Sequence, residues 1–154
     1  MATTSRVPDA IDALVGIVKG LGLEDVRVVD GPDAVNATEK HRIHIGWSPA
    51  GEAAVTLQQQ WNAAGARTRD EQFTIACYAE SRGGDKDMSA RRRRLFDMVA
   101  AIEQAIRATA QNPQAPDLNG TVLWAELSTG DLIQNQADGA FAGLAFSVTC
   151  RARI

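Results

Sequence analysis

The segment from Arg69 to Arg107 most constrains the fold, because it joins a strand to a long helix through one short polar loop. Alternate side chains between residues 73 and 80 are apolar, which predicts a half-buried strand. The predicted buried face consists of Phe73, Ile75, Cys77 and Ala79. Two adjacent glycines and several charges follow in residues 81–87, a composition typical of a turn.

A helical pattern begins at Met88. Apolar residues then recur three or four positions apart, which is the spacing of one helix face. That face consists of Leu95, Val99, Ile102 and Ile106, and we expect Phe96 and Met98 to widen it. The strand and the helix are therefore predicted to share one core.

The other predicted helix and strands precede and follow this strand–helix unit in the sequence. A first helix is predicted from Pro8 to about Lys19, because proline suits a first turn and the following glycines favour a stop. Alternation predicts strands at residues 26–29, 41–47, 52–61, 120–127 and 144–154. The polar stretch 128–139 is expected to be a connection that contains at most a short strand near residues 131–136.

This order predicts an α+β fold: a mainly antiparallel β-sheet sandwich with a long helix packed on it and an N-terminal helix. We expect strands 41–47, 52–61 and 73–80 to form an antiparallel meander of three. The chain has 154 residues, of which 45% are hydrophobic, and this is enough for one core. Residues 1–154 are therefore predicted to form a single domain.

Charge and hydropathy narrow the function classes. The net charge of −3 and the isoelectric point near 5.3 give no global electrostatic case for nucleic-acid binding. No apolar run approaches the roughly 20 residues needed to cross a membrane, so we expect no membrane contact. Cys77 and Cys150 fall at inward strand positions, and we expect both to be buried and reduced.

No pattern predicts catalysis or a metal site. His41 and His44 would lie on opposite faces of one strand, as would Asp70 and Glu71, so neither pair converges on one atom. The glycines before the long helix lack the lysine and hydroxyl residue of a phosphate-binding loop. We therefore expect no enzyme activity and no cofactor.

The run Arg91-Arg92-Arg93-Arg94 is the conspicuous charge cluster. Four successive helical residues turn through about 400°, so these side chains radiate instead of forming one patch. The first interpretation is that these arginines lie on a solvent-exposed helix face and pair with nearby aspartates. The alternative is that some of the four contact a neighbouring subunit or, non-specifically, DNA.

Two strand segments offer more contact surface than a small core requires, which favours an assembly protein. Interfaces commonly use tryptophan and arginine as anchors. The candidate interface residues are Gln58, Gln60, Trp61, Arg91, Arg92, Arg94, Trp124 and Glu126.

In their order and spacing these segments resemble the tail terminator (tail completion) proteins of long-tailed bacteriophages and related tail-like particles. The resemblance runs nearly end to end. It rests on the N-terminal helix, Ile43-His44-Ile45-Gly46-Trp47, Asp70-Glu71-Gln72-Phe73-Thr74-Ile75, Gly84-Asp85, the arginine-containing helix through Ile106, Leu118-Asn119-Gly120-Thr121-Val122, and the closing segment 139–154.

The resemblance implies a non-catalytic virion protein, made in the host cytoplasm and placed at the head-proximal end of the tail. Such proteins form a hexameric ring on the tail tube protein, end its polymerisation and face the head–tail connector or stopper protein. Contact with DNA in the ring lumen is one role open to the arginine run. Two alternatives stay open: a connector or stopper protein itself, and a small non-viral α+β ligand-binding domain.

Overall fold

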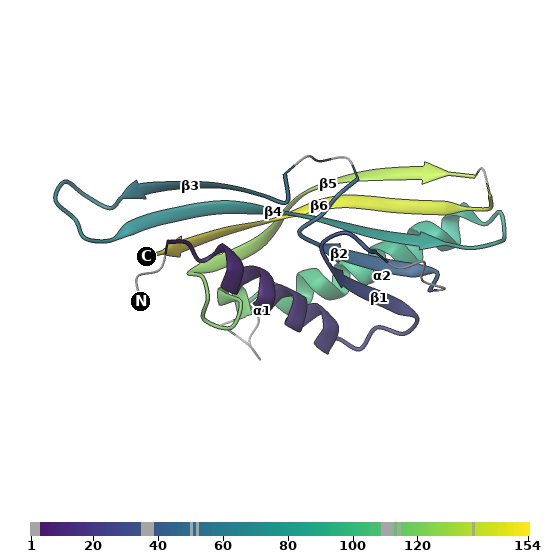
Figure 1. Cartoon of the computed structure of the whole chain (residues 1–154). Coiled ribbons are helices and arrows are strands. Elements are labelled where there is room, and N and C mark those ends of the chain that lie inside the picture. Colours follow the sequence, from purple (N-terminus) through teal and green to yellow (C-terminus); the bar gives the residue numbers. More distant parts are fainter. Residues whose placement is uncertain are drawn as a thin grey trace.

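The computed structural model describes residues 4–34, 39–49, 51, 53–108, 113, 115–136 and 138–154. Within them, two helices pack on one mixed, mostly antiparallel six-stranded sheet, which confirms the predicted α+β class (Figure 1). The elements in chain order are α1 (Val7–Gly20), β1 (Val26–Asp30), β2 (His41–Ile45), β3 (Val55–Trp61), β4 (Arg69–Arg82), α2 (Met88–Ile106), the 3₁₀ turn η1 (Ala115–Asp117), β5 (Trp124–Asn135) and β6 (Phe141–Arg153).

The sheet is built around β4, which pairs with three other strands. β6 follows β4 from Asp70 to Arg82 along one edge. Along the other edge, β3 pairs with residues 69–75 and β2 pairs with residues 77–81. The predicted meander is therefore wrong, because β2 and β3 lie end to end against β4. The fourteen residues of β4 are long enough to accept both partners, and β1 joins β2 in parallel.

β5 also differs from the prediction. Leu118, Asn119 and Gly120 all have positive φ, and the turn that they form delays the strand until Trp124. The strand then continues to Asn135 through most of the stretch expected to be a connection, with one irregularity between Leu127 and Thr129. Its backbone is paired with β6 over this length, and backbone pairing does not require apolar side chains.

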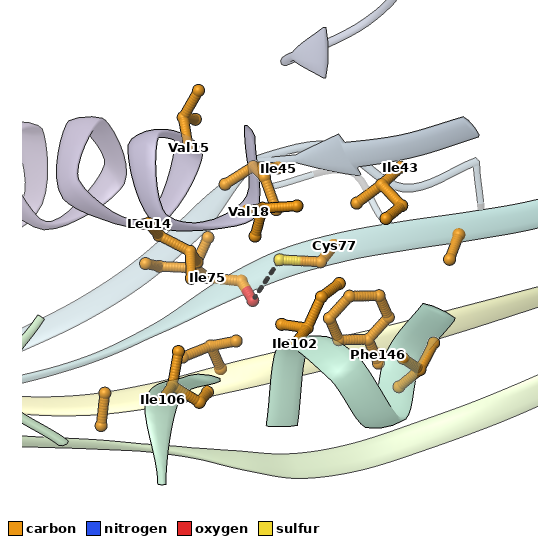
Figure 2. Close-up of a cluster of buried hydrophobic side chains, with 14 of the residues drawn as sticks. Leu14, Val15, Val18, Ile43, Ile45, Ile75, Cys77, Ile102, Ile106 and Phe146 are labelled. Atoms are coloured by element: carbon orange, nitrogen blue, oxygen red, sulfur yellow. Dashed lines mark hydrogen bonds between the residues drawn. The ribbon is translucent and has the colours of Figure 1, made fainter. Parts of the chain in front are cut away.

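Both helices cover the same face of the sheet, and the core lies between the two layers (Figure 1). The predicted strand face and helix stripe are buried there, and Ile102 lies close to Cys77 and Phe146 in Figure 2. Phe96 is 45% exposed, contrary to prediction. It follows Leu95 by one residue, which turns it about 100° away from the buried stripe.

Cys77 and Cys150 are both buried and free. Burial raises the pKa of each thiol to about 12. The Cys77 thiol lies 3.8 Å from the carbonyl oxygen of Ile75, as Figure 2 shows. Both side chains therefore act as small hydrophobic groups in the core, as expected.

Part of the opposite sheet face, which we call the outer face, is also packed. Gly46 has a φ of 76°, and after this turn Trp47 lies against His44, with their ring centroids 4.7 Å apart. Strict alternation over the predicted strand 41–47 would place Trp47 on the face of Ile43 and Ile45, and the turn at Gly46 explains why it does not lie there. Tyr78 is buried in this aromatic cluster. Outer-face residues at this end of β4 are therefore shielded, unlike those near Arg69.

The depth of the helix–sheet contact gives a stability prediction. Ile102→Ala truncates a fully buried side chain and should lower the free energy of unfolding by about 2–5 kcal/mol. Phe96→Ala, an exposed truncation on the same helix, should change it by less than about 0.5 kcal/mol. Chemical denaturation of both variants measures the difference. Equal losses would show that the buried face of α2 is assigned wrongly.

Candidate assembly surfaces

The hairpin formed by β3, the first half of β4 and their connecting turn is the most prominent projection of the molecule. We call residues 55–75 the hairpin arm. In Figure 1 it extends beyond both helices and past the C-terminal end of β6. Gln58 and Gln60 are exposed on its outer face, and Trp61 is 62% exposed on the helix-side face. Three of the predicted interface residues therefore lie together on one accessible element.

A buried carboxylate fastens the arm to the N-terminal helix. Glu71 is fully buried, and its side chain accepts hydrogen bonds from the Arg6 backbone N–H at 2.8 Å and from the Gln59 amide at 2.6 Å. The Gln59 amide also donates to the carbonyl oxygen of Thr4 at 2.8 Å. The carboxylate lies at the start of α1, where the helix dipole favours negative charge. The angle at which the arm leaves the core is thus tied to α1.

A second carboxylate, that of Asp70, binds arginines on the outer face of β4. Asp70 lies 2.9 Å from Arg153 and 3.5 Å from Arg151, both on β6. The hydrogen bond from Arg153 lowers the pKa of Asp70. Asp70 and Glu71 point to opposite faces of β4, as predicted from their adjacency. The structure gives each of them a separate set of partners, one on each face of the arm.

The second predicted surface lies at the start of β5. Trp124 pairs with Arg151 and Glu126 pairs with Thr149, which places both on the outer face, where Trp124 is half-buried and Glu126 is exposed. At the same edge of the sheet, a groove of about 390 Å³ lies between β5, η1 and the end of α2, so it opens toward the helix layer and not on the outer face. Its lining includes Glu103, Ile106, Arg107, Trp124, Ala125, Glu126 and Leu127.

These two surfaces lie at opposite edges of the sheet. The strand order is β1-β2-β4-β6-β5, with β3 on the β2 side of β4. β3 and β5 are thus separated by β4 and β6. The arm and the groove belong to the same sheet but lie apart on it, so Trp61 and Trp124 belong to different surfaces.

The three candidate arginines have partners within the chain. Arg91 donates to the carbonyl oxygen of Arg82 at 3.2 Å, and Arg92 donates to the side-chain oxygen of Gln134 at 2.8 Å. Arg94 donates to the carbonyl oxygen of Glu24 at 2.5 Å. The run therefore radiates toward β4, β5 and the loop between α1 and β1, as its helical spacing predicts. These bonds favour an anchoring role for α2, and contact with a subunit or DNA stays a prediction.

The two histidines occupy opposite sheet faces, as predicted. The His44 imidazole lies 3.0 Å from the carbonyl oxygen of Gly31, whereas His41 is buried toward α2. Burial lowers the pKa of His41, and the positive charges of Arg94 and Arg91 lower it further. No group of three potential metal ligands occurs in the described part of the chain. Within the same ranges, no helix has the length and hydropathy of a membrane span.

Sequence reasoning missed three residues that shape the arm. Leu57 lies within the predicted strand 52–61, and alternation alone does not show that its side chain is 45% exposed. Nothing in the sequence pattern indicates that the side chains of Gln59 and Glu71 bond each other and the start of α1. One signal was available for Glu71: it occupies the same inward alternation as Phe73 and Ile75.

Similarity to known proteins does not assign a family. No protein-family model matches the chain, and no curated protein is significantly similar to it in sequence.

The buried carboxylate of Glu71 gives a prediction for the contact between the arm and α1. Glu71→Ala should lower the free energy of unfolding by about 1–3 kcal/mol, because it leaves the Arg6 N–H and the Gln59 amide without their acceptor. Glu71→Gln keeps one acceptor oxygen and should lower the free energy of unfolding by less than Glu71→Ala does. Glu126→Ala, the removal of an exposed carboxylate, is the matched control and should be nearly neutral. Denaturation curves for Glu71→Ala and Glu126→Ala that coincide would contradict this account.

Proposed function

We propose that this protein is a tail terminator: a structural subunit that forms a hexameric ring on a tail tube, ends polymerisation of the tube and joins the tail to the head connector. The family resemblance described from the sequence leads to this proposal. It implies a cap with no catalysis, assembled from identical subunits inside the host cell and carried at the head-proximal end of the tail.

The observation that carries the proposal is the pair of separate surfaces on opposite sheet edges. A closed ring uses a heterologous interface, in which one patch of each subunit meets a different patch of the next. The hairpin arm and the β5 groove are two such patches, with different shapes and no overlap. A ring built this way still exposes the sheet's outer face and the helix layer, which leaves surfaces for the tube and for the connector.

A ligand-binding domain is the second candidate, and the β5 groove is the observation that favours it. Its volume of about 390 Å³ lies within the range of small-molecule sites, which span about 300–1,000 Å³. A stand-alone binding domain does not require self-association, whereas a ring does. The molecular mass of the assembled protein therefore separates the two candidates.

The direct test removes the protein from the particle. Particles produced without this chain should have overlong tails or tails that lack heads, since nothing would end the tube or join it to the connector. Electron microscopy of negatively stained particles measures tail length and head attachment, and supplying the intact gene product in trans is the control. Tails of normal length joined to heads would overturn the proposal.

A further inference from the structure

The start of β2 buries an imidazole against the helix layer. His41 is 8% exposed, and it lies between Val26 of β1 and Ser81 of β4, with which it is paired. Ser81 is fully buried. Within the described residues, neither the His41 Nδ1 atom nor the Ser81 hydroxyl has a hydrogen-bond partner. A proton added to this imidazole therefore finds no acceptor at Nδ1 among those residues, which makes the charged form costly.

Two arginines of α2 are fixed near this imidazole. Arg94 donates to the carbonyl oxygen of Glu24 at 2.5 Å, and Arg91 donates to that of Arg82 at 3.2 Å. Arg91 also packs on the backbone that follows β4, because a Cβ atom at Gly83 would lie only 3.0 Å from its Nη1 atom. The arginine side chain is not deprotonated in proteins. Both positive charges are therefore permanent, and backbone contacts hold them in place.

The other charges around His41 do not cancel those of the arginines. Burial lowers the pKa of His41, and the charges of Arg94 and then Arg91 lower it further. Lys40, the residue before β2, also lowers this pKa, whereas Asp25 in the loop between α1 and β1 raises it. The residues paired with His41 on β1 and β4 carry no charge. One carboxylate thus opposes three cations, and the pKa stays below its ordinary value of 6.5.

The contact around His41 joins α2 to one edge of the sheet. β1 is paired with β2 at this edge, and Arg94 ties the loop before β1 to α2. We infer that His41 makes this contact sensitive to acid: the neutral imidazole lets α2 pack on the β1–β2 edge, and protonation loosens α2 from that edge. A further positive charge beside Arg91 and Arg94 is relieved when the edge moves away and water reaches the imidazole. The inference goes beyond the proposed function and holds whether or not the protein caps a tail.

The sign of the effect follows from the direction of the pKa shift. The unfolded chain protonates His41 near the ordinary pH of 6.5, whereas the folded chain does so at a lower pH. Below pH 6.5 the unfolded state therefore binds more protons, and stability falls as the pH falls toward the pKa of the folded state. Above pH 6.5, His41 is neutral in both states and adds no pH dependence.

An NMR titration of the imidazole signals tests the electrostatic step. The chain has two histidines, so their signals are resolved and assigned through their backbone connections. His41 should titrate below pH 6.5, and Arg94→Gln should raise its pKa because a neighbouring positive charge is removed. Arg93→Gln, at an exposed position of the same run, is the matched control and should leave it unchanged. A wild-type His41 pKa at or above 6.5, or the same pKa in both variants, would overturn the inference.

Amide hydrogen exchange of the full chain locates the loosening. At about pH 5, compared with about pH 7 after correction for intrinsic exchange rates, the wild type should lose protection in β1, β2 and the start of α2. Residues 69–75 of β4, which lie away from His41 and pair with β3 and β6, should keep theirs. His41→Gln takes up no proton in this range and should be equally protected at both pH values. Each chain is compared with itself, so a general loss of stability in the variant does not alter the test. An equal loss in wild type and His41→Gln, or a loss spread evenly over the sheet, would overturn the inference.

Discussion

The length of β4 is the constraint from which the rest of the structure follows. Its fourteen residues pair with β6 along one edge and with β3 and then β2 along the other. The helix layer covers only part of this length, as Figure 1 shows, so the uncovered part must project together with β3. An isolated two-stranded hairpin is marginally stable in water. The arm therefore depends on its attachment to β6 and to α1.

That attachment uses carboxylates on both faces of β4. Glu71 accepts from the start of α1 on one face, and Asp70 binds the arginines of β6 on the other. Removing a charged partner from a buried site costs more than the net gain of an ordinary hydrogen bond, because the remaining donors stay unpaired. The arm is thus held at a defined angle to the core, and a projection used for assembly benefits from such preorganisation.

The elements with strong local periodicity were predictable from the sequence. The buried faces of β4 and α2 follow from spacings of two and of three or four, and the structure confirms both apart from Phe96. Pairing was not predictable, because β2 and β3 compete for the same partner and their choice depends on contacts distant in sequence. The second half of β5 was also missed, since residues 129–135 are mostly polar and are aligned only by their pairing with β6.

The sequence pointed to several residues of the candidate surfaces, but it did not show how these surfaces are arranged in space. Trp61 and Trp124 stand out in a chain with 5% aromatic residues, and the structure places them on two separate surfaces. The roles of Gln59 and Glu71 require knowing that α1 begins beside the arm. The arginine run is the reverse case. The pattern is conspicuous in the sequence, yet Arg91, Arg92 and Arg94 bond two strands and one loop of their own chain.

The central claim is that two different edges of the sheet become covered together when copies of the chain associate. Amide hydrogen exchange of the wild-type protein at low and high concentration tests it directly, because it reports protection for each segment. The account predicts that slower exchange at high concentration appears both in residues 55–62 and in residues 124–131. Slower exchange in only one of these segments, or in α1 and β1 instead, would contradict it.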